Sequence, residues 1–190
     1  MITVNYREQV LQFETEPTLF SPKKVDQGTL AMLSQTEFMD GDKVLDLGCG
    51  YGVAGILAAG VVGEQSVVMS DCSAIAVRTA KENAVRNGYP GIKTIQSDAY
   101  DQIKDVDFSL ILSNPPYHTD FSVAKRFIQG GYQHLVSGGR MIMVVKRLLW
   151  YRNKLTSVFG GVKVRESNGY YVLIAEKREK KWKEGRKRIK

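Results

Sequence analysis

Four consecutive residues, Asn114-Pro115-Pro116-Tyr117, follow a short apolar run at positions 108–113. A residue before proline is driven out of the helical region and each proline restricts its own φ, so this segment is stiff and extended. The Asn114 side-chain oxygen and the Pro115 carbonyl can accept hydrogen bonds from an NH2 group, and the Tyr117 ring can stack on a flat substrate. We therefore expect Asn114 to Tyr117 to form a pocket that orients a planar amino nitrogen.

Upstream of this segment lies a turn that contains three glycines, Gly48, Gly50 and Gly52. Glycine adopts positive φ readily and lets a ligand approach the backbone closely. Residues 50–55 also match the dinucleotide-binding fingerprint formally, with Asp71 about twenty residues further on, so a nicotinamide cofactor is the competing interpretation.

Three carboxylates follow successive predicted strands: Asp46, Asp71 and Asp98. In open α/β sheets the ligand lies beyond the carboxyl ends of the strands. Asp46 would not favour a pyrophosphate, but it can hold the ammonium of S-adenosylmethionine and lie near the positive sulfonium. Asp71 can accept from both ribose hydroxyls and Asp98 from the adenine amine, which favours S-adenosylmethionine over a nicotinamide. The same loops supply further expected cofactor contacts, namely Cys49, Cys72, Ala99 and Asn114.

These residues need a scaffold, and apolar segments of strand length alternate with amphipathic segments of helix length. We expect strands at 43–47, 66–70, 92–96, 108–113 and 140–146, and helices at 27–39, 53–59, 73–88, 122–136 and 150–159. This alternation is typical of parallel strands that are joined by crossover helices.

The end of the chain breaks the alternation. Strands are expected at 162–166 and 170–176, and the residues between them, Ser167-Asn168-Gly169, contain a strong hairpin signal. Parallel neighbours cannot be joined so tightly, so one of these strands runs antiparallel to its neighbour. The predicted fold is α/β, a Rossmann-like, doubly wound, seven-stranded sheet with one reversed strand in a C-terminal hairpin.

Length and charge predict a single domain, residues 1–176, followed by a basic tail, residues 177–190. The tail holds nine Lys or Arg and two Glu, and the remainder balances at 18 against 18. With Trp182 among its lysines, the tail suits an anionic, base-bearing partner, although a solubilising end or a membrane-surface segment are alternatives. The chain shows neither a membrane-spanning run nor a signal-peptide pattern, and its two cysteines lack zinc-ligand partners, so we expect a cytoplasmic protein without a metal.

Residues 13–178 resemble the class I S-adenosylmethionine-dependent methyltransferases, and more narrowly the catalytic domain of small-subunit ribosomal RNA guanine 2-amino methyltransferases (RsmC type, MTS family). The likeness rests on Phe20-Ser21 with Asp26-Gln27-Gly28-Thr29, on residues 44–50 and 71–77, on 113–118, and on Gly138-Gly139. The resemblance implies that Asp46, Gly48, Gly50, Asp71 and Asp98 contact the cofactor and that Asn114 to Tyr117 form the target pocket.

Such relatives carry an additional N-terminal domain, whereas this chain begins almost directly at the catalytic domain. We therefore expect substrate docking to come from the basic tail and from a basic patch near residue 146. Expected substrate contacts are Phe20, Lys146, Arg147 and Arg152, with Lys154 in the same patch.

The expected reaction is direct transfer of the sulfonium methyl to an exocyclic amine of a nucleobase, first of all the guanine 2-amino group of ribosomal RNA. The expected partner is ribosomal RNA or a ribosomal subunit, and the enzyme is expected as a monomer or a homodimer. Methylation of a glutamine amide in a protein such as a release factor, methylation of an adenine amine, and a non-catalytic RNA-binding role remain alternatives.

Overall fold

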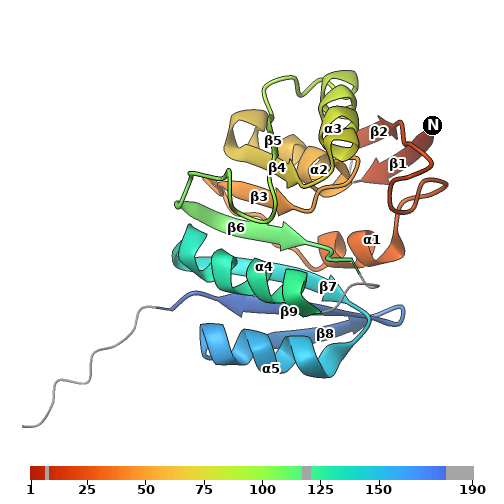
Figure 1. Ribbon diagram of the computed structural model, residues 1–190. Coiled ribbons are helices and arrows are strands. Elements are labelled where there is room, and N and C mark those ends of the chain that lie inside the picture. The colour runs from red at the N-terminus through yellow and green to blue at the C-terminus, as the bar shows by residue number, and fades with distance from the viewer. Residues whose placement is uncertain (7–8, 117–120, 179–190) are drawn as a thin grey trace, which may run out of the picture.

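The computed structural model describes residues 1–6, 9–116 and 121–178. Seven strands form its central sheet: β3 (Val44–Leu47), β4 (Val67–Asp71), β5 (Lys93–Gln96), β6 (Phe108–Ser113), β7 (Leu135–Val145), β8 (Lys163–Ser167) and β9 (Tyr170–Glu176). Their order across the sheet is β5-β4-β3-β6-β7-β9-β8 (Figure 1). The order reverses between β3 and β6, so the sheet is doubly wound and the predicted fold class is confirmed.

The C-terminal hairpin supplies the reversed strand. β3 to β7 pair in parallel, whereas β9 is antiparallel to both β7 and β8. Asn168 and Gly169 have φ values of 50° and 75°, which is the positive-φ pair that a tight hairpin turn needs. Because Val145 pairs with Tyr171, this turn lies at the edge of the sheet where the parallel strands end.

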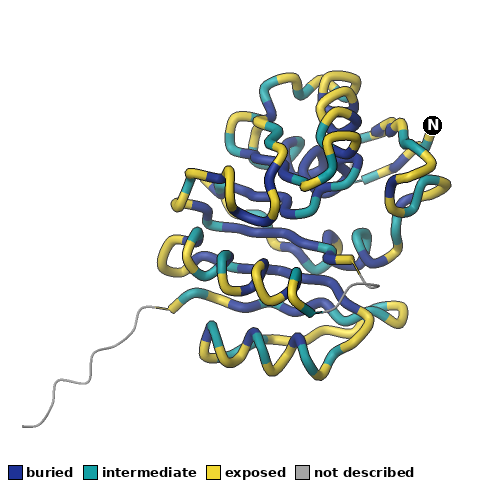
Figure 2. Tube along the Cα trace, viewed as in Figure 1, coloured by how far each residue is buried: buried dark blue, intermediate teal, exposed yellow. Residues whose placement is uncertain are grey.

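Helices cover both faces of the sheet. One face carries α1 (Gln27–Ser34), α2 (Val53–Val62) and α3 (Ala74–Arg86), and the other carries α4 (Phe121–His134) and α5 (Leu148–Phe159) (Figure 1). Neighbouring strand residues alternate between the two hydrophobic cores, as Val44 and Leu45 do. The central strands β3, β4, β6 and β7 are accordingly mostly buried in the middle of the molecule, whereas the edge strand β8 is largely exposed and the edge strand β5 partly exposed (Figure 2). None of the described helices combines the length and the apolar character needed to cross a bilayer.

A two-stranded sheet of β1 (Ile2–Tyr6) and β2 (Gln9–Phe13) was not expected from the sequence. It packs against α2 and α3, where Gln9 donates to the Gly60 carbonyl and Asn83 exchanges hydrogen bonds with the backbone of Glu14. The fully buried Asn83 amide also donates to the Tyr51 carbonyl at 2.9 Å. The β1–β2 sheet is thereby linked to the turn that contains Gly48, Gly50 and Gly52.

Several boundaries differ from the expected ones: β7 begins at Leu135 instead of residue 140, and α1 ends at Ser34 instead of residue 39. The Ser34 and Thr36 hydroxyls donate to carbonyls of the preceding turn, which satisfies acceptors that a longer helix would have used. The Arg140 guanidinium then donates a hydrogen bond to the Glu37 carbonyl at 2.8 Å. A contact from β7, over a hundred residues away, thus holds the segment after α1 in a non-helical conformation.

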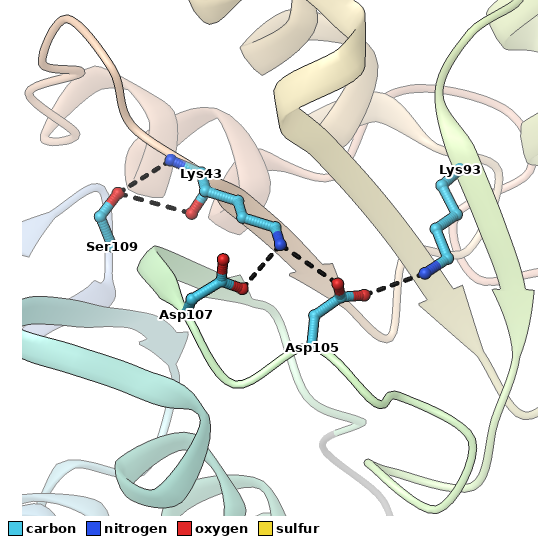
Figure 3. A network of polar contacts seen from close by, with 5 residues as sticks. All are labelled: Lys43, Lys93, Asp105, Asp107 and Ser109. Atoms are coloured by element: carbon cyan, nitrogen blue, oxygen red, sulfur yellow. Dashed lines mark hydrogen bonds and ion pairs between the residues drawn. The ribbon is translucent and has the colours of Figure 1, made fainter.

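An ion-pair network closes the amino-terminal edge of the sheet (Figure 3). Lys43 Nζ lies 2.6 Å from Asp107 and 3.1 Å from Asp105, and Lys93 Nζ lies 2.9 Å from Asp105. The hydrogen bond from Lys93, with the neighbouring Lys43, lowers the pKa of Asp105. Ser109 accepts from the Lys43 N–H at 2.9 Å. The network holds the connection between β5 and β6 against the start of β3.

Candidate active site

A cavity of about 420 Å³ opens at the carboxyl ends of β3, β4 and β6, where the strand order reverses. Most predicted site residues line it: Phe20, Asp46, Gly48, Cys49, Gly50, Asp71, Cys72, Asp98, Ala99, Asn114, Pro115 and Pro116. Gly52 and the predicted basic contacts Lys146, Arg147 and Arg152 are outside this lining. The predicted stacking residue, Tyr117, lies outside the described residues.

The turn after β3 depends on glycine conformations. Gly48 and Gly50 have φ values of 75° and 54°, and a Cβ at Gly50 would meet no protein atom within 4 Å. The N–H groups of Gly48 and Cys49 donate to the Ser70 carbonyl at 2.8 and 2.9 Å, which ties the turn to β4. Gly52 also has a positive φ, 93°, and a Cβ there would in addition lie 3.2 Å from Met69, Ile56 and Ala80. Both the backbone conformation and the packing at the start of α2 therefore favour glycine at this position.

Asp46 is a buried carboxylate at the end of β3. Its Oδ2 accepts from the Gly55 N–H of α2 at 2.7 Å. Burial raises the pKa of Asp46 to about 7, against the opposing effect of the Gly55 hydrogen bond and with a contribution from Asp71. A cation bound in the cavity would therefore gain most from Asp46 when the carboxylate is ionised.

Asp71, at the end of β4, is held in one orientation by backbone donors. Gly50 N–H donates to Oδ2 at 3.0 Å and Ser73 N–H donates to Oδ1 at 2.9 Å. Each carboxylate oxygen keeps a second lone pair, so a pair of ligand hydroxyls can still donate to Asp71. Beside it, the Ser70 hydroxyl lines the cavity fully buried and has no hydrogen-bond partner among the described residues. Such an atom suits a polar ligand.

Asp98 is already engaged by a partner that the sequence did not indicate. Arg126 Nη1 of α4 donates to Asp98 Oδ2 at 2.7 Å. Its Nη2 donates to the Asp98 carbonyl at 3.1 Å and lies 3.3 Å from Asp101 Oδ1. The next residue, Ala99, has a φ of 52°. Arg126 thus clamps α4 onto the loop after β5, and any ligand amine at Asp98 would share this carboxylate with a guanidinium.

Asn114 is oriented by two side chains of α1. Its Nδ2 donates to Asp26 Oδ2 at 2.8 Å and to Thr29 Oγ1 at 2.9 Å. Asp26 is also the N-cap of α1, and the same Oδ2 accepts from the Thr29 N–H at 3.0 Å. These two hydrogen bonds fix the orientation of the Asn114 amide, which lines the cavity. The sequence reasoning quoted Asp26 and Thr29 only as part of a family motif and missed this contact.

The glycine of the same motif has a packing reason. A Cβ at Gly28 would lie 2.7 Å from Asp26 Oδ2 and 2.8 Å from the Tyr170 ring. Any side chain there would displace the carboxylate that holds Asn114. Lys146 Nζ lies 5.1 Å from the centroid of the same Tyr170 ring. The predicted basic contact Lys146 therefore contacts the ring that packs against Gly28 of α1, although it does not line the cavity.

Comparisons with known proteins agree with this geometry. The family model "Methyltransferase small domain" matches residues 10–175. The chain belongs to this methyltransferase family. It is 32% identical over 171 residues to "Ribosomal RNA small subunit methyltransferase C" of Serratia proteamaculans, with 88% of this chain and 49% of that protein covered. It is 29% identical to the uncharacterized protein YbxB of Bacillus subtilis, with 90% of this chain and 88% of that protein covered.

Among solved structures, the T. thermophilus 16S rRNA N2 G1207 methyltransferase RsmC, in complex with AdoMet and guanosine, matches with a TM-score of 0.83 at 28% identity. The match covers 93% of this chain and 50% of that one. The chain therefore spans about half the length of the ribosomal RNA methyltransferases that it matches. The expected methyltransferase identity is confirmed, and the nicotinamide interpretation is set aside.

The residues of this methyltransferase fit S-adenosylmethionine. The cavity offers buried Asp46 for a cation, Asp71 for hydroxyls and the partnerless Ser70 hydroxyl for a further polar atom. Apolar side chains of α4, Val123 and Phe127, supply a wall for a flat ring. Among the described residues there is no group of three His, Cys, Asp or Glu side chains that could hold a metal ion.

Proposed function

We propose that this methyltransferase transfers a methyl group from S-adenosylmethionine to the 2-amino group of a guanine in ribosomal RNA. The observation that carries the proposal is the Asn114 amide, which lines the cofactor cavity and whose Nδ2 is held by Asp26 and Thr29. The matched relatives named as ribosomal RNA small subunit methyltransferases, and the RsmC structure with AdoMet and guanosine, support the choice of base and RNA. A cytoplasmic location follows from that substrate.

The cofactor supplies an electrophilic sulfonium methyl, and the chain supplies orientation. Asn114 Oδ1 and the Pro115 carbonyl accept the two hydrogens of the substrate amine, which points the nitrogen lone pair away from them. Pro115 and Pro116 stiffen this segment, so the acceptors do not move with the substrate. Such positioning can supply on the order of 7 to 11 kcal/mol of the barrier. The methylated nitrogen carries a positive charge and then loses its surplus proton to water, so no strong base is needed. Tyr117 is proposed to stack on the guanine ring.

We assign the cofactor contacts to the residues that line the cavity. Asp46 binds the ammonium, Asp71 the ribose hydroxyls, and Asp98 with Ala99 the adenine edge. Asp98 performs this role while it is paired with Arg126, so the adenine amine competes with a guanidinium for one carboxylate. Phe20, half exposed beside the cavity, and the neighbouring cations Lys146, Arg147 and Arg152 contact the RNA around the target base.

The test is transfer of labelled methyl to a panel of unmodified ribosomal subunits, ribosomal RNA transcripts, transfer RNA, DNA and release factors, followed by nucleoside and amino-acid analysis. Recovery of the label as 2-methylamino guanine supports the proposal. Label in glutamine or in adenine keeps the site chemistry but refutes the substrate. Tight cofactor binding with no label in any acceptor refutes the proposed reaction for the chain alone.

A further inference from the structure

Charge is segregated along this chain. Between Phe121 and Arg165 there is no Asp or Glu, and the segment holds nine Lys or Arg. The first 120 residues show the opposite balance, with sixteen Asp or Glu against nine Lys or Arg. Residues 1–176 are therefore near neutral in total but consist of two oppositely charged parts. A protein surface more usually intersperses both signs of charge.

The fold keeps the two parts separate in space. Residues 121–165 form α4, β7, α5 and the start of β8, so both helices on one face of the sheet belong to the acid-free segment (Figure 1). The acidic part pairs largely within itself, as the network of Lys43 with Asp105 and Asp107 illustrates (Figure 3). Among the described residues, Arg126 is the one cation of α4 and α5 that these carboxylates pair with.

Few ion pairs connect the two parts. Among the described residues, only Arg126, which pairs with Asp98 and Asp101, and Arg140, which pairs with Asp42, reach across. No described carboxylate lies within 4 Å of five further cations of the segment, namely Lys125, Arg147, Arg152, Lys154 and Lys163. Four of these five are exposed, and Lys154 is half-buried.

We infer that the side of the sheet covered by α4 and α5, with the cations Lys125, Arg147, Arg152 and Lys154, docks the sugar-phosphate backbone of the RNA that carries the target base. We call these four residues the basic face. The inference rests on the proposed function, because that function supplies the polyanion. Lys125 lies in the first turns of α4, which begins just after the target-pocket segment. The register Ser113 to Met143 brings the end of β7, and with it Arg147, alongside residues that follow β6. The basic face therefore starts at the target pocket.

An RNA backbone fits this face better than a membrane or an apolar protein surface. On α4 and α5 the only large hydrophobic side chain that is markedly exposed is Leu149, at 64%. Membrane-surface helices and stable protein interfaces need a larger apolar area. Phosphate binding needs only cations, and releases counterions in proportion to the phosphates neutralised.

A matched pair of double variants tests the inference in the full chain. Arg152→Gln/Lys154→Gln removes two cations from the basic face, and Lys81→Gln/Lys104→Gln removes two exposed cations from α3 and the loop before β6. Binding of an unmodified small-subunit ribosomal RNA transcript is measured over a series of salt concentrations. Each lost phosphate contact reduces the magnitude of the slope of log K against log salt by about 0.7. The magnitude of the slope should therefore fall by roughly 1.4 in Arg152→Gln/Lys154→Gln and stay unchanged in Lys81→Gln/Lys104→Gln.

Equal slope changes in both variants, or no change in either, would overturn the inference. A membrane partner would also overturn it. In that case wild-type protein would bind vesicles of equal parts phosphatidylglycerol and phosphatidylcholine, and Arg152→Gln/Lys154→Gln would abolish this binding while the salt slope of RNA binding stays unchanged. Methyl transfer to the panel of acceptors separates the two proposals. A slope difference with no label in any acceptor supports the basic face and refutes the proposed function. Label in guanine with unchanged slopes supports the proposed function and refutes the basic face.

Discussion

The contact between Asp26 and Asn114 gives the sharpest prediction, because one oxygen performs two tasks. Asp26 Oδ2 accepts from the Thr29 N–H at 3.0 Å as a helix N-cap and from Asn114 Nδ2 at 2.8 Å. The two tasks can be separated by the choice of substitution. Asp26→Ser keeps a good N-cap but is too short to reach Asn114, whereas Asp26→Asn can place an amide oxygen where Oδ2 lies and keep both contacts.

The magnitude follows from the type of bond. A hydrogen bond to a charged group contributes about 1.5 to 3 kcal/mol, and a neutral one about 0.5 to 1.5 kcal/mol. Thr29 Oγ1 still holds the other amide hydrogen, so the Asn114 amide loses part of its orientation and not all of it. We expect kcat to fall roughly 10- to 100-fold in Asp26→Ser and by less than about tenfold in Asp26→Asn.

The assay is single-turnover methyl transfer to the acceptor identified in the panel, together with calorimetric cofactor binding and thermal unfolding. Cofactor affinity should stay within about twofold of wild type in both variants, and the melting temperature of Asp26→Ser should change little because the cap is retained. Equal rates in the Ser and Asn variants would refute the reasoning. A rise in cofactor Kd at constant kcat would do so as well, because Asp26 would then act on the cofactor cavity and not on the acceptor.

Four further predictions concern the cavity and the tail. Asn114→Ala should abolish transfer and leave cofactor binding nearly intact in calorimetry, and a strong loss of cofactor affinity would contradict this division of roles. Cofactor affinity should rise with pH and level off above about 7, because the cation binds ionised Asp46; the profile should be flat in Asp46→Asn. The pKa of Asp46 is raised on folding from its ordinary value of 3.8 to about 7, so the free protein should lose stability to urea as pH rises from about 4 through 7, and a stability gain over that range would show that Asp46 is not the controlling group. Removal of residues 179–190 should weaken RNA binding and flatten its salt dependence, with Lys177 retained because its backbone pairs with Gly138 and Gly139; unchanged salt dependence would limit the tail to solubility.

Local sequence patterns predicted most of the scaffold. The period of two in strands and the helical spacing of apolar residues located the elements to within a few residues. Asn168-Gly169 identified the hairpin because only certain residues adopt positive φ at low cost. These signals are local: each depends on the conformational preferences of neighbouring residues, so they can be detected without knowledge of the partners. The β1–β2 sheet escaped because its strands are stabilised by α2 and α3, which no local pattern reveals.

The residues of the site also fall into those that local sequence patterns identify and those that only the packing reveals. Asp46, Asp71, Asp98 and Asn114 could be found from the sequence, because strand ends of a parallel sheet meet at one edge and polar residues there face a ligand. The partners of these residues could not. Asp26 lies 88 positions from Asn114, and Arg126 lies 28 positions from Asp98. Hydrogen bonds of this kind depend on the packing of α1 and α4 against the sheet, and packing is decided by the whole chain. The sequence by itself determined which groups carry the chemistry, and the tertiary structure decided how those groups are held and on which face the uncompensated positive charge gathers.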